Sequence, residues 1–116
     1  MKKLRVLISL ILIGLLFALL MNAAGHPAEA ARPYSDITVI MYMTDWCPYC
    51  IQARGYIKSL GVRLIEHDIE RDKDKARESM RKSGRRGVPI IDVEGVVIPG
   101  YSPDRIKSAV EMKRSL

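Results

Sequence analysis

The sequence has little cysteine and no internal repeat. Its two cysteines, Cys47 and Cys50, are too few for a scaffold held together by several disulfides. It also lacks a strong excess of one charge: the net charge is +6, and from residue 31 onward 16 basic residues accompany 12 acidic ones. A surplus of that size does not require nucleic acid as a partner.

Length and composition then limit the fold. The 116 residues allow one domain and argue against two, because domains usually have about 100–150 residues. Hydrophobic residues make up 48% of the chain, which excludes an intrinsically disordered protein. We therefore expect one small globular domain.

Residues 1–24 have the character of a targeting segment. Three basic residues among the first five precede an almost unbroken apolar run over residues 6–21, and small residues follow. A basic start, an apolar stretch and an A-x-A-like site are typical of a secretory signal peptide. The candidate cleavage sites are Ala23-Ala24-Gly25 and Ala28-Glu29-Ala30.

An uncleaved transmembrane anchor is the alternative for the same segment. The apolar run has 16 residues, or 18 if Leu4 and Asn22 are included, whereas a transmembrane helix needs about 20 with a lower limit of about 17. An anchor would contact the membrane through residues 4–21. Both interpretations keep the basic start in the cytoplasm and export the rest of the chain. We expect a periplasmic protein, either free or anchored in the bacterial inner membrane.

A linker and one domain follow. Residues 25–35 are rich in Ala, Gly and Pro and have no helical or strand period, so they are predicted to form a linker. Residues 36–116 are predicted to form the folded domain. Strands are expected at residues 37–43, 62–67, 89–93 and 96–98, and helices at 48–60, 70–82 and from 103 or 104 to the end.

This order, βαβαββα, predicts an α/β fold. A strand, a helix and a second strand form a parallel pair, and the turn at Glu94-Gly95 adds an antiparallel hairpin. We expect a mixed four-stranded sheet flanked by helices and preceded by the N-terminal hydrophobic helix. The helix at 70–82 is strongly charged and has a thin apolar stripe of Ala76 and Met80.

The cysteine pair carries the chemistry that the sequence predicts. Cys47-Pro48-Tyr49-Cys50 stands where the first strand ends and the first helix begins, and residues three apart lie on one face of a helix. The unpaired N–H groups at a helix N-terminus favour a thiolate at Cys47, which is the attacking species in disulfide exchange. Cys50 lies one turn further in and suits the resolving role.

Metal binding is the alternative use of the two sulfurs. Zinc would need two further ligands, for which only His26 and His67 are available. Copper(I) needs only two thiolates, and the segment from Met43 to Cys50 is partly similar to the Met-Thr-Cys-x-x-Cys loop of copper chaperones. A Cu(I)-binding module without catalysis therefore stays open beside a redox-active dithiol.

Three motifs follow one another along the domain: Cys47-Pro48-Tyr49-Cys50 after an apolar strand, Val88-Pro89 about forty residues later, and Gly100 with Asp104. In this order and at this spacing they resemble the glutaredoxins, a family of the thioredoxin-like superfamily. The resemblance implies a thioredoxin-like fold and a thiol–disulfide oxidoreductase that needs no metal or flavin.

The resemblance also implies roles for single residues. Val88 would offer its backbone to an extended substrate, and Pro89 would follow a cis peptide bond. Tyr49, Gly100 and Asp104 would lie beside glutathione or another thiol substrate. The sequence departs from the family pattern at several positions. Thr44 stands where many glutaredoxins carry Lys, Gly87 where many carry Thr, and Trp46 is more typical of thioredoxins. The run from Gly100 to Pro103 resembles glutaredoxin-like reductants that thioredoxin reductase serves.

Several neighbours of the motifs allow two interpretations. Arg86, with the basic residues around it, either binds a substrate carboxylate or belongs to a solvated loop. Trp46 is expected as a lid beside Cys47. Asp45 either raises the thiol pKa or serves the helix N-cap region. Asp68 is expected to start a loop and to help cap the next helix.

The function that combines these observations is disulfide exchange outside the cytoplasm. We expect a monomer whose partners are protein disulfides or a glutathione-type thiol, with glutathione as a candidate co-substrate. No nucleic acid is expected as a partner.

Overall fold

The computed structural model describes residues 1–22 and 30–116. It divides the chain into two compact units, residues 1–30 and residues 31–116. Residues 23–29 hold most of both candidate cleavage sites, His26 and part of the predicted linker, and these predictions therefore lie outside the described residues.

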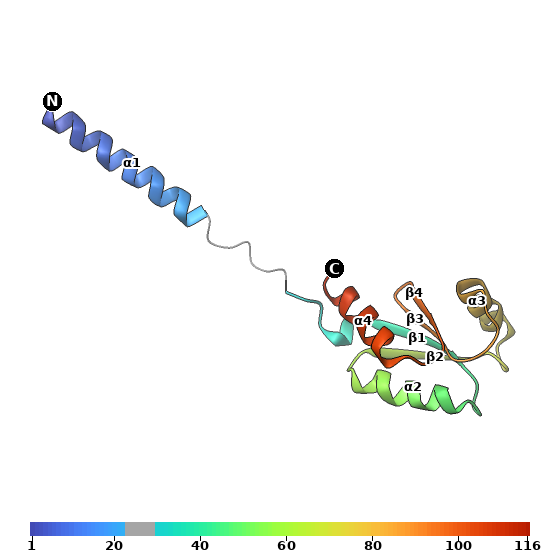
Figure 1. Cartoon of the computed structure of the whole chain (residues 1–116). Helices are drawn as coiled ribbons and strands as arrows, with labels where there is room; N and C mark the ends of the chain where they lie inside the picture. The colour runs from blue at the N-terminus through green and yellow to red at the C-terminus, as the bar shows by residue number, and fades with distance from the viewer. Residues whose placement is uncertain (23–29) are drawn as a thin grey trace. The chain divides into compact units, whose positions relative to one another are not determined.

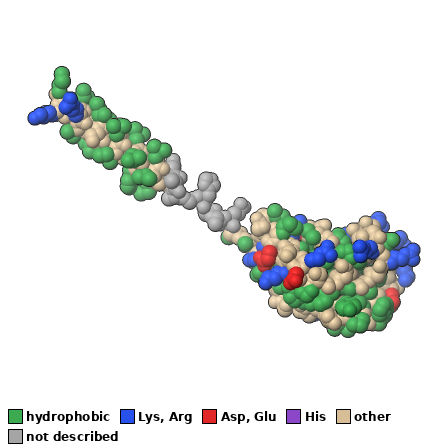
Figure 2. All heavy atoms as spheres, in the orientation of Figure 1, with side chains coloured by type: hydrophobic (Ala, Val, Ile, Leu, Met, Phe, Trp, Pro, Cys, Tyr) green, Lys and Arg blue, Asp and Glu red, His purple; other side chains and the backbone are tan. Residues whose placement is uncertain are grey.

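Among its described residues, the N-terminal unit has one helix, α1 (Lys2–Asn22), of 21 residues. The side chains of residues 2–21 are exposed, and this stretch is long and apolar enough to cross a membrane. Figure 2 shows hydrophobic side chains along the helix and Lys and Arg side chains at its N-terminal end. A signal sequence has the same length and composition, so the helix agrees with both predicted uses.

The domain is built on a four-stranded mixed sheet, as predicted (Figure 1). Its strands are β1 (Thr38–Met43), β2 (Arg63–Asp68), β3 (Ile90–Val93) and β4 (Val96–Pro99), in the spatial order β2-β1-β3-β4. β1 and β2 are parallel, and the other two pairs are antiparallel. The carboxyl ends of β1 and β2 therefore lie at the same edge of the sheet.

Three α-helices and a short 3-10 helix complete the domain: η1 (Tyr34–Asp36), α2 (Pro48–Ser59), α3 (Lys73–Ser83) and α4 (Pro103–Arg114). α3 begins three residues later than predicted. Its N-cap is Asp72, whose carboxylate accepts a hydrogen bond from the backbone N–H of Lys75 at 3.1 Å. Asp68 instead accepts from Glu70 N–H at 2.9 Å and so stabilises the preceding turn, and its predicted role as a helix cap is wrong.

The hydrophobic core lies between the sheet and the helices α2 and α4. Side chains alternate along a strand, so Val39, Met41 and Met43 of β1 point to one face. There they join one core cluster with the fully buried Ile57 of α2 and Val110 of α4. This packing positions the N-terminus of α2, where both cysteines lie.

Helix α3 packs against the opposite face through polar groups. Tyr42 of β1 donates a hydrogen bond to Glu78, and Lys82 lies 2.6 Å from the buried carboxylate of Asp92 on β3. The predicted apolar stripe of α3 is wrong in part, because Met80 is exposed and the neighbouring Ser79 is buried. The sheet face beneath α3 carries the phenol of Tyr42 and the carboxylate of Asp92. Polar side chains of α3 pair with these groups, so the buried side of the helix is polar rather than apolar.

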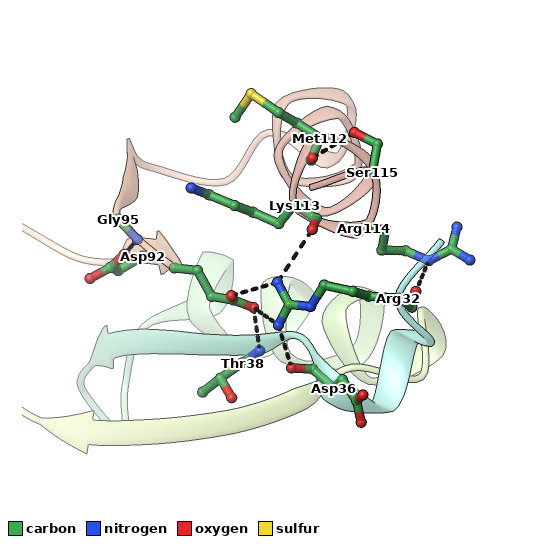
Figure 3. A network of polar contacts seen from close by, with 10 residues as sticks. Arg32, Asp36, Thr38, Asp92, Gly95, Met112, Lys113, Arg114 and Ser115 are labelled. Atoms are coloured by element: carbon green, nitrogen blue, oxygen red, sulfur yellow. Dashed lines mark hydrogen bonds and ion pairs between the residues drawn. The ribbon is translucent and has the colours of Figure 1, made fainter. Parts of the chain in front are cut away.

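The segment before β1 is attached to the C-terminal helix. The guanidinium of Arg32 donates to Glu94 at 2.9 Å and to the backbone carbonyls of Asp36 and Lys113 (Figure 3). The guanidinium of Arg114 lies 3.8 Å from the centre of the Tyr34 ring. Residues 31–35, whose composition predicts a linker, thus belong to the compact unit of the domain.

Candidate active site

Cys47 occupies the N-cap of α2. Its backbone is extended (φ −78°, ψ 111°), and its Sγ accepts a hydrogen bond from the backbone N–H of Cys50 at 3.1 Å. Pro48 follows at the first helical position, where its fixed φ is favourable and a missing N–H is tolerated. A sulfur in the N-cap position takes the place of the usual oxygen acceptor, which places Cys47 where negative charge is stabilised.

The two cysteines form a disulfide. Their Cα atoms lie 5.2 Å apart, within the range of protein disulfides. Cys50 is completely buried and Cys47 is 3% exposed, but Cys47 lines an open groove on the surface. The pair is therefore asymmetric: a partner can reach Cys47 from the groove, whereas Cys50 lies behind it in the core.

The groove beside Cys47 has a volume of about 650 Å³. Its described lining residues are Thr44, Trp46, Cys47, Pro48, Tyr49, Ile69, Glu70, Lys73, Gly87 and Val88. Trp46 is 66% exposed and lines the groove beside Cys47. Its indole N–H donates to the carboxylate of Glu70 at 2.8 Å, which orients the ring.

The segment before β3 also lines the groove. The peptide bond between Val88 and Pro89 is cis, as the resemblance implies, and Pro89 is fully buried. Val88 itself lines the groove. The carbonyl of Pro89 accepts a hydrogen bond from Gly100 N–H at 2.8 Å, and Gly100 has a φ of +84°, which glycine adopts without strain. Gly100 thus helps to fix the Val88–Pro89 segment through this hydrogen bond.

The structure does not bring every predicted site residue into this groove. Tyr49 and Val88 line it, but Gly100, Asp104 and Arg86 are not among its described lining residues. Arg86 lines a neighbouring pocket of about 400 Å³ with Met80 and other residues of α3. Asp104 lies in the first turn of α4 beside a third pocket, over Val96 of β4.

The segment after β2 contributes three lining residues that the sequence did not predict: Ile69, Glu70 and Lys73. They follow β2, and the carboxyl end of β2 lies beside that of β1, from which the Cys47 loop leaves. The rule that sites form where parallel strands end would have pointed to this segment. Ile69 N–H donates to the Met43 carbonyl at 3.0 Å, which ties the two loops together.

Asp45 does not cap α2. Its carboxylate lies 2.6 Å from the guanidinium of Arg71, and both side chains are largely exposed. The N-cap of α2 is Cys47 itself. The ion pair neutralises the acid nearest to the cysteine in sequence, two residues before it.

The groups with shifted pKa values lie away from the disulfide in two places: one cluster lies beneath α3, and the other comprises Tyr34, Glu94 and Glu111, close to Arg32 and α4. Hydrogen bonds from Lys75 and Tyr42 lower the pKa of Glu78 to about 2. Burial and the contact with Glu78 raise the pKa of Tyr42. Burial acts to lower the pKa of Lys82, but hydrogen bonds to Asp92 and Tyr42 outweigh it and raise that pKa. At neutral pH the groups beneath α3 keep their protonation states, and their contacts stabilise the packing of α3 on the sheet.

The described residues offer no ready zinc site. Within residues 1–22 and 30–116, no group of three or more His, Cys, Asp and Glu side chains lies close enough to hold a metal ion. His67 packs against the ring of Tyr42, with 5.7 Å between the ring centres, on the face of the sheet that α3 covers. It therefore does not complete a ligand set with the two sulfurs.

Comparisons with known proteins agree with this geometry. The sequence model of the Glutaredoxin family matches residues 39–98. A probable glutaredoxin of Synechocystis is 37% identical over 87 residues, which cover 73% of this chain and 75% of the relative. The solved glutaredoxin of Archaeoglobus fulgidus matches with a TM-score of 0.55 at 22% identity, covering 65% of this chain and 87% of that chain. A buckwheat glutaredoxin–glutathione complex matches with a TM-score of 0.53 at 16% identity, covering 72% and 81%.

Proposed function

Because the chain belongs to the glutaredoxin family and is a thiol–disulfide oxidoreductase, we propose that Cys47 is its attacking thiol and that Cys50 resolves the mixed disulfide. The observation that carries this proposal is the position of Cys47 Sγ. It caps α2, accepts the N–H of Cys50 and lines the groove. Hydrogen bonding and the helix N-terminus both favour the thiolate, which is the nucleophile in exchange.

The reaction starts from the reduced protein. The Cys47 thiolate attacks one sulfur of a substrate disulfide, so that a Cys47–substrate bond forms and the substrate bond breaks. The leaving sulfur departs as a thiolate and takes up a proton. Cys50, after losing its proton, then attacks Cys47 Sγ and releases the second substrate sulfur. Two electrons have passed to the substrate, and the protein holds the Cys47–Cys50 disulfide.

We propose that the substrate lies along the groove between Trp46 and Val88. Its backbone would pair with that of Val88, and Tyr49 would contact it on the α2 side. Glutathione is the proposed small co-substrate, supported by the buckwheat relative that was solved with glutathione. In this arrangement Arg86 would reach a substrate carboxylate beyond the end of the groove, and Gly100 and Asp104 would support the substrate site.

We further propose that exchange takes place outside the cytoplasm. α1 is a 21-residue helix with a basic N-terminal end and an apolar remainder, and this pattern supports both a signal peptide and a membrane anchor. The domain would then act as a monomer in the periplasm, free or tethered to the inner membrane. Cell fractionation, with the mass of the mature chain measured, separates the tethered form from the cleaved one. Recovery in the cytoplasm would contradict the export.

Trapping tests the assigned roles of the two cysteines. In the Cys50→Ser variant the resolving thiol is missing, so we expect a stable mixed disulfide between Cys47 and its substrate. The matched control is Cys47→Ser, which should trap nothing. Equal trapping by both variants would contradict the assignment. Stoichiometric Cu(I) binding by the reduced protein, without exchange on an insulin or mixed-disulfide substrate, would support the copper-binding alternative instead.

A further inference from the structure

Thr44 lies at the groove with a buried hydroxyl group that has no partner. The residue is 3% exposed, and its Oγ1 makes no hydrogen bond within the part of the chain that the structure describes. It follows the last residue of β1 and lines the same groove as Cys47. Its carbonyl accepts the N–H of Cys47 at 3.3 Å, which holds the two residues together.

An unpaired buried hydroxyl has a measurable cost. Leaving such a donor without a partner destabilises a protein, and most buried polar atoms therefore find one. The neighbouring group whose chemistry changes in the reaction is Cys47. In the disulfide its sulfur is neutral and a weak acceptor, but after reduction it can carry a full negative charge.

The charged residues that line the groove do not by themselves stabilise a thiolate at Cys47, so a neutral hydrogen-bond donor would contribute. Among the described residues that line it, Lys73 is the one cation, and Glu70 is present beside it with the opposite charge. A thiolate at Cys47 therefore depends on dipoles. The N-terminus of α2 supplies such dipoles, and its Cys50 N–H donates directly to Cys47 Sγ. A hydroxyl group would be a further donor.

We propose that Thr44 Oγ1 donates a hydrogen bond to the Cys47 thiolate in the reduced protein and so stabilises the attacking species. This inference rests on the proposed function of Cys47. While the Cys47–Cys50 disulfide is present, the hydroxyl has no hydrogen-bond partner. It gains one when an external dithiol donates two electrons and reduces the disulfide. Thr44 thus favours the reduced form over the oxidised form.

The test compares Thr44→Val, which keeps the shape and removes the hydroxyl, with Thr44→Ser, which keeps the hydroxyl. The rate at which iodoacetamide labels Cys47 in the reduced full chain is measured against pH. We expect Thr44→Val to raise the Cys47 pKa, so that labelling at a pH below the pKa slows by about tenfold. Thr44→Ser should stay near the original protein. Thr38→Val, at the other end of β1, is the matched control and should change nothing.

A second measurement keeps the test independent of labelling. In a glutathione redox buffer, Thr44→Val should shift the equilibrium toward the disulfide by about tenfold, because the paired state is lost. Its oxidised form should be at least as stable to heat as the original protein, since an unpaired hydroxyl has been removed. An unchanged pKa and equilibrium in Thr44→Val, or equal shifts in Thr44→Ser, would overturn the role of Thr44.

These measurements also distinguish a failure of the proposal for Thr44 from a failure of the proposed roles of Cys47 and Cys50. If the original protein exchanges disulfides and Thr44→Val behaves like it, the proposal for Thr44 fails alone. If Cys47 of the original protein labels no faster than an ordinary free cysteine and exchanges nothing, the proposed roles of the cysteines fail.

Discussion

The guanidinium of Arg32 donates a 2.9 Å hydrogen bond to the carboxylate of Glu94, which lies 62 residues further along the chain. The same guanidinium donates to the carbonyls of Asp36 and Lys113, and Glu94 also accepts the N–H of Thr38 at 3.2 Å (Figure 3). One side chain therefore joins the entry to β1, the β3–β4 turn and the end of α4. The contact places the structural start of the domain before residue 36.

We expect Arg32→Ala to lower the free energy of unfolding of the domain by about 1 kcal/mol. The hydrogen bonds of Arg32 are partly exposed, so each contributes little to stability. The substitution nevertheless removes the side chain that joins the entry to β1, the β3–β4 turn and the end of α4. Urea unfolding followed by circular dichroism measures the change. Arg63→Ala removes the same charge from an exposed position at the start of β2 and should change stability much less. Equal effects of the two variants would contradict the structural role of Arg32.

The cluster beneath α3 predicts a dependence of stability on acid. The pKa of Glu78 is lowered to about 2, so its contribution is complete above its ordinary pKa near 4.5 and is lost as the pH falls toward 2. Glu78→Gln should therefore destabilise the protein by about 1–2 kcal/mol at pH 7. The difference between the two proteins should shrink as unfolding is measured at lower pH. A difference that stays constant from pH 7 to pH 2.5 would show that the charge does not matter.

Lys82 and Asp92 should be energetically coupled. The carboxylate of Asp92 is buried and accepts from Lys82 Nζ at 2.6 Å and from Gly95 N–H at 2.7 Å. Asp92→Asn keeps an acceptor for Gly95 but removes the charge that pairs with Lys82. A double-mutant cycle with Lys82→Met should give a coupling energy of about 1–2 kcal/mol. Additive effects of the two substitutions would mean that each acts on its own.

The exposed ring of Trp46 should matter for large substrates. It walls the groove beside Cys47 and is oriented by Glu70. Trp46→Ala should lower kcat/KM for a protein disulfide by about tenfold, a loss of about 1.4 kcal/mol of binding in the transition state. A small disulfide such as hydroxyethyl disulfide should react nearly as before. Ile51→Ala changes another exposed apolar residue, which is not among the described lining residues, and it should have no effect. Parallel losses on both substrates would point to damage at Cys47 instead.

Local sequence patterns determined much of this protein. The apolar run of α1, the βαβαββα order and the placement of Cys47-Pro48-Tyr49-Cys50 at a strand–helix junction all follow from short-range periodicity and from residues such as Pro48 that favour one position. Most element boundaries agree within one or two residues. The start of α3 was misplaced because Glu70 and Arg71 are good helix formers, yet Asp68 and Asp72 draw the chain into a turn and a later cap.

The tertiary structure alone decided which distant residues meet. The parallel register of β1 and β2 brings Ile69, Glu70 and Lys73 to the groove, although they lie about twenty residues beyond the cysteines. Packing of α3 on the sheet buries Ser79 and leaves Met80 exposed, and it pairs Lys82 with Asp92. Contacts of this kind depend on how whole elements pack, which no short stretch of sequence encodes. The burial of the unpaired Thr44 hydroxyl arises in the same way, from the packing around the end of β1.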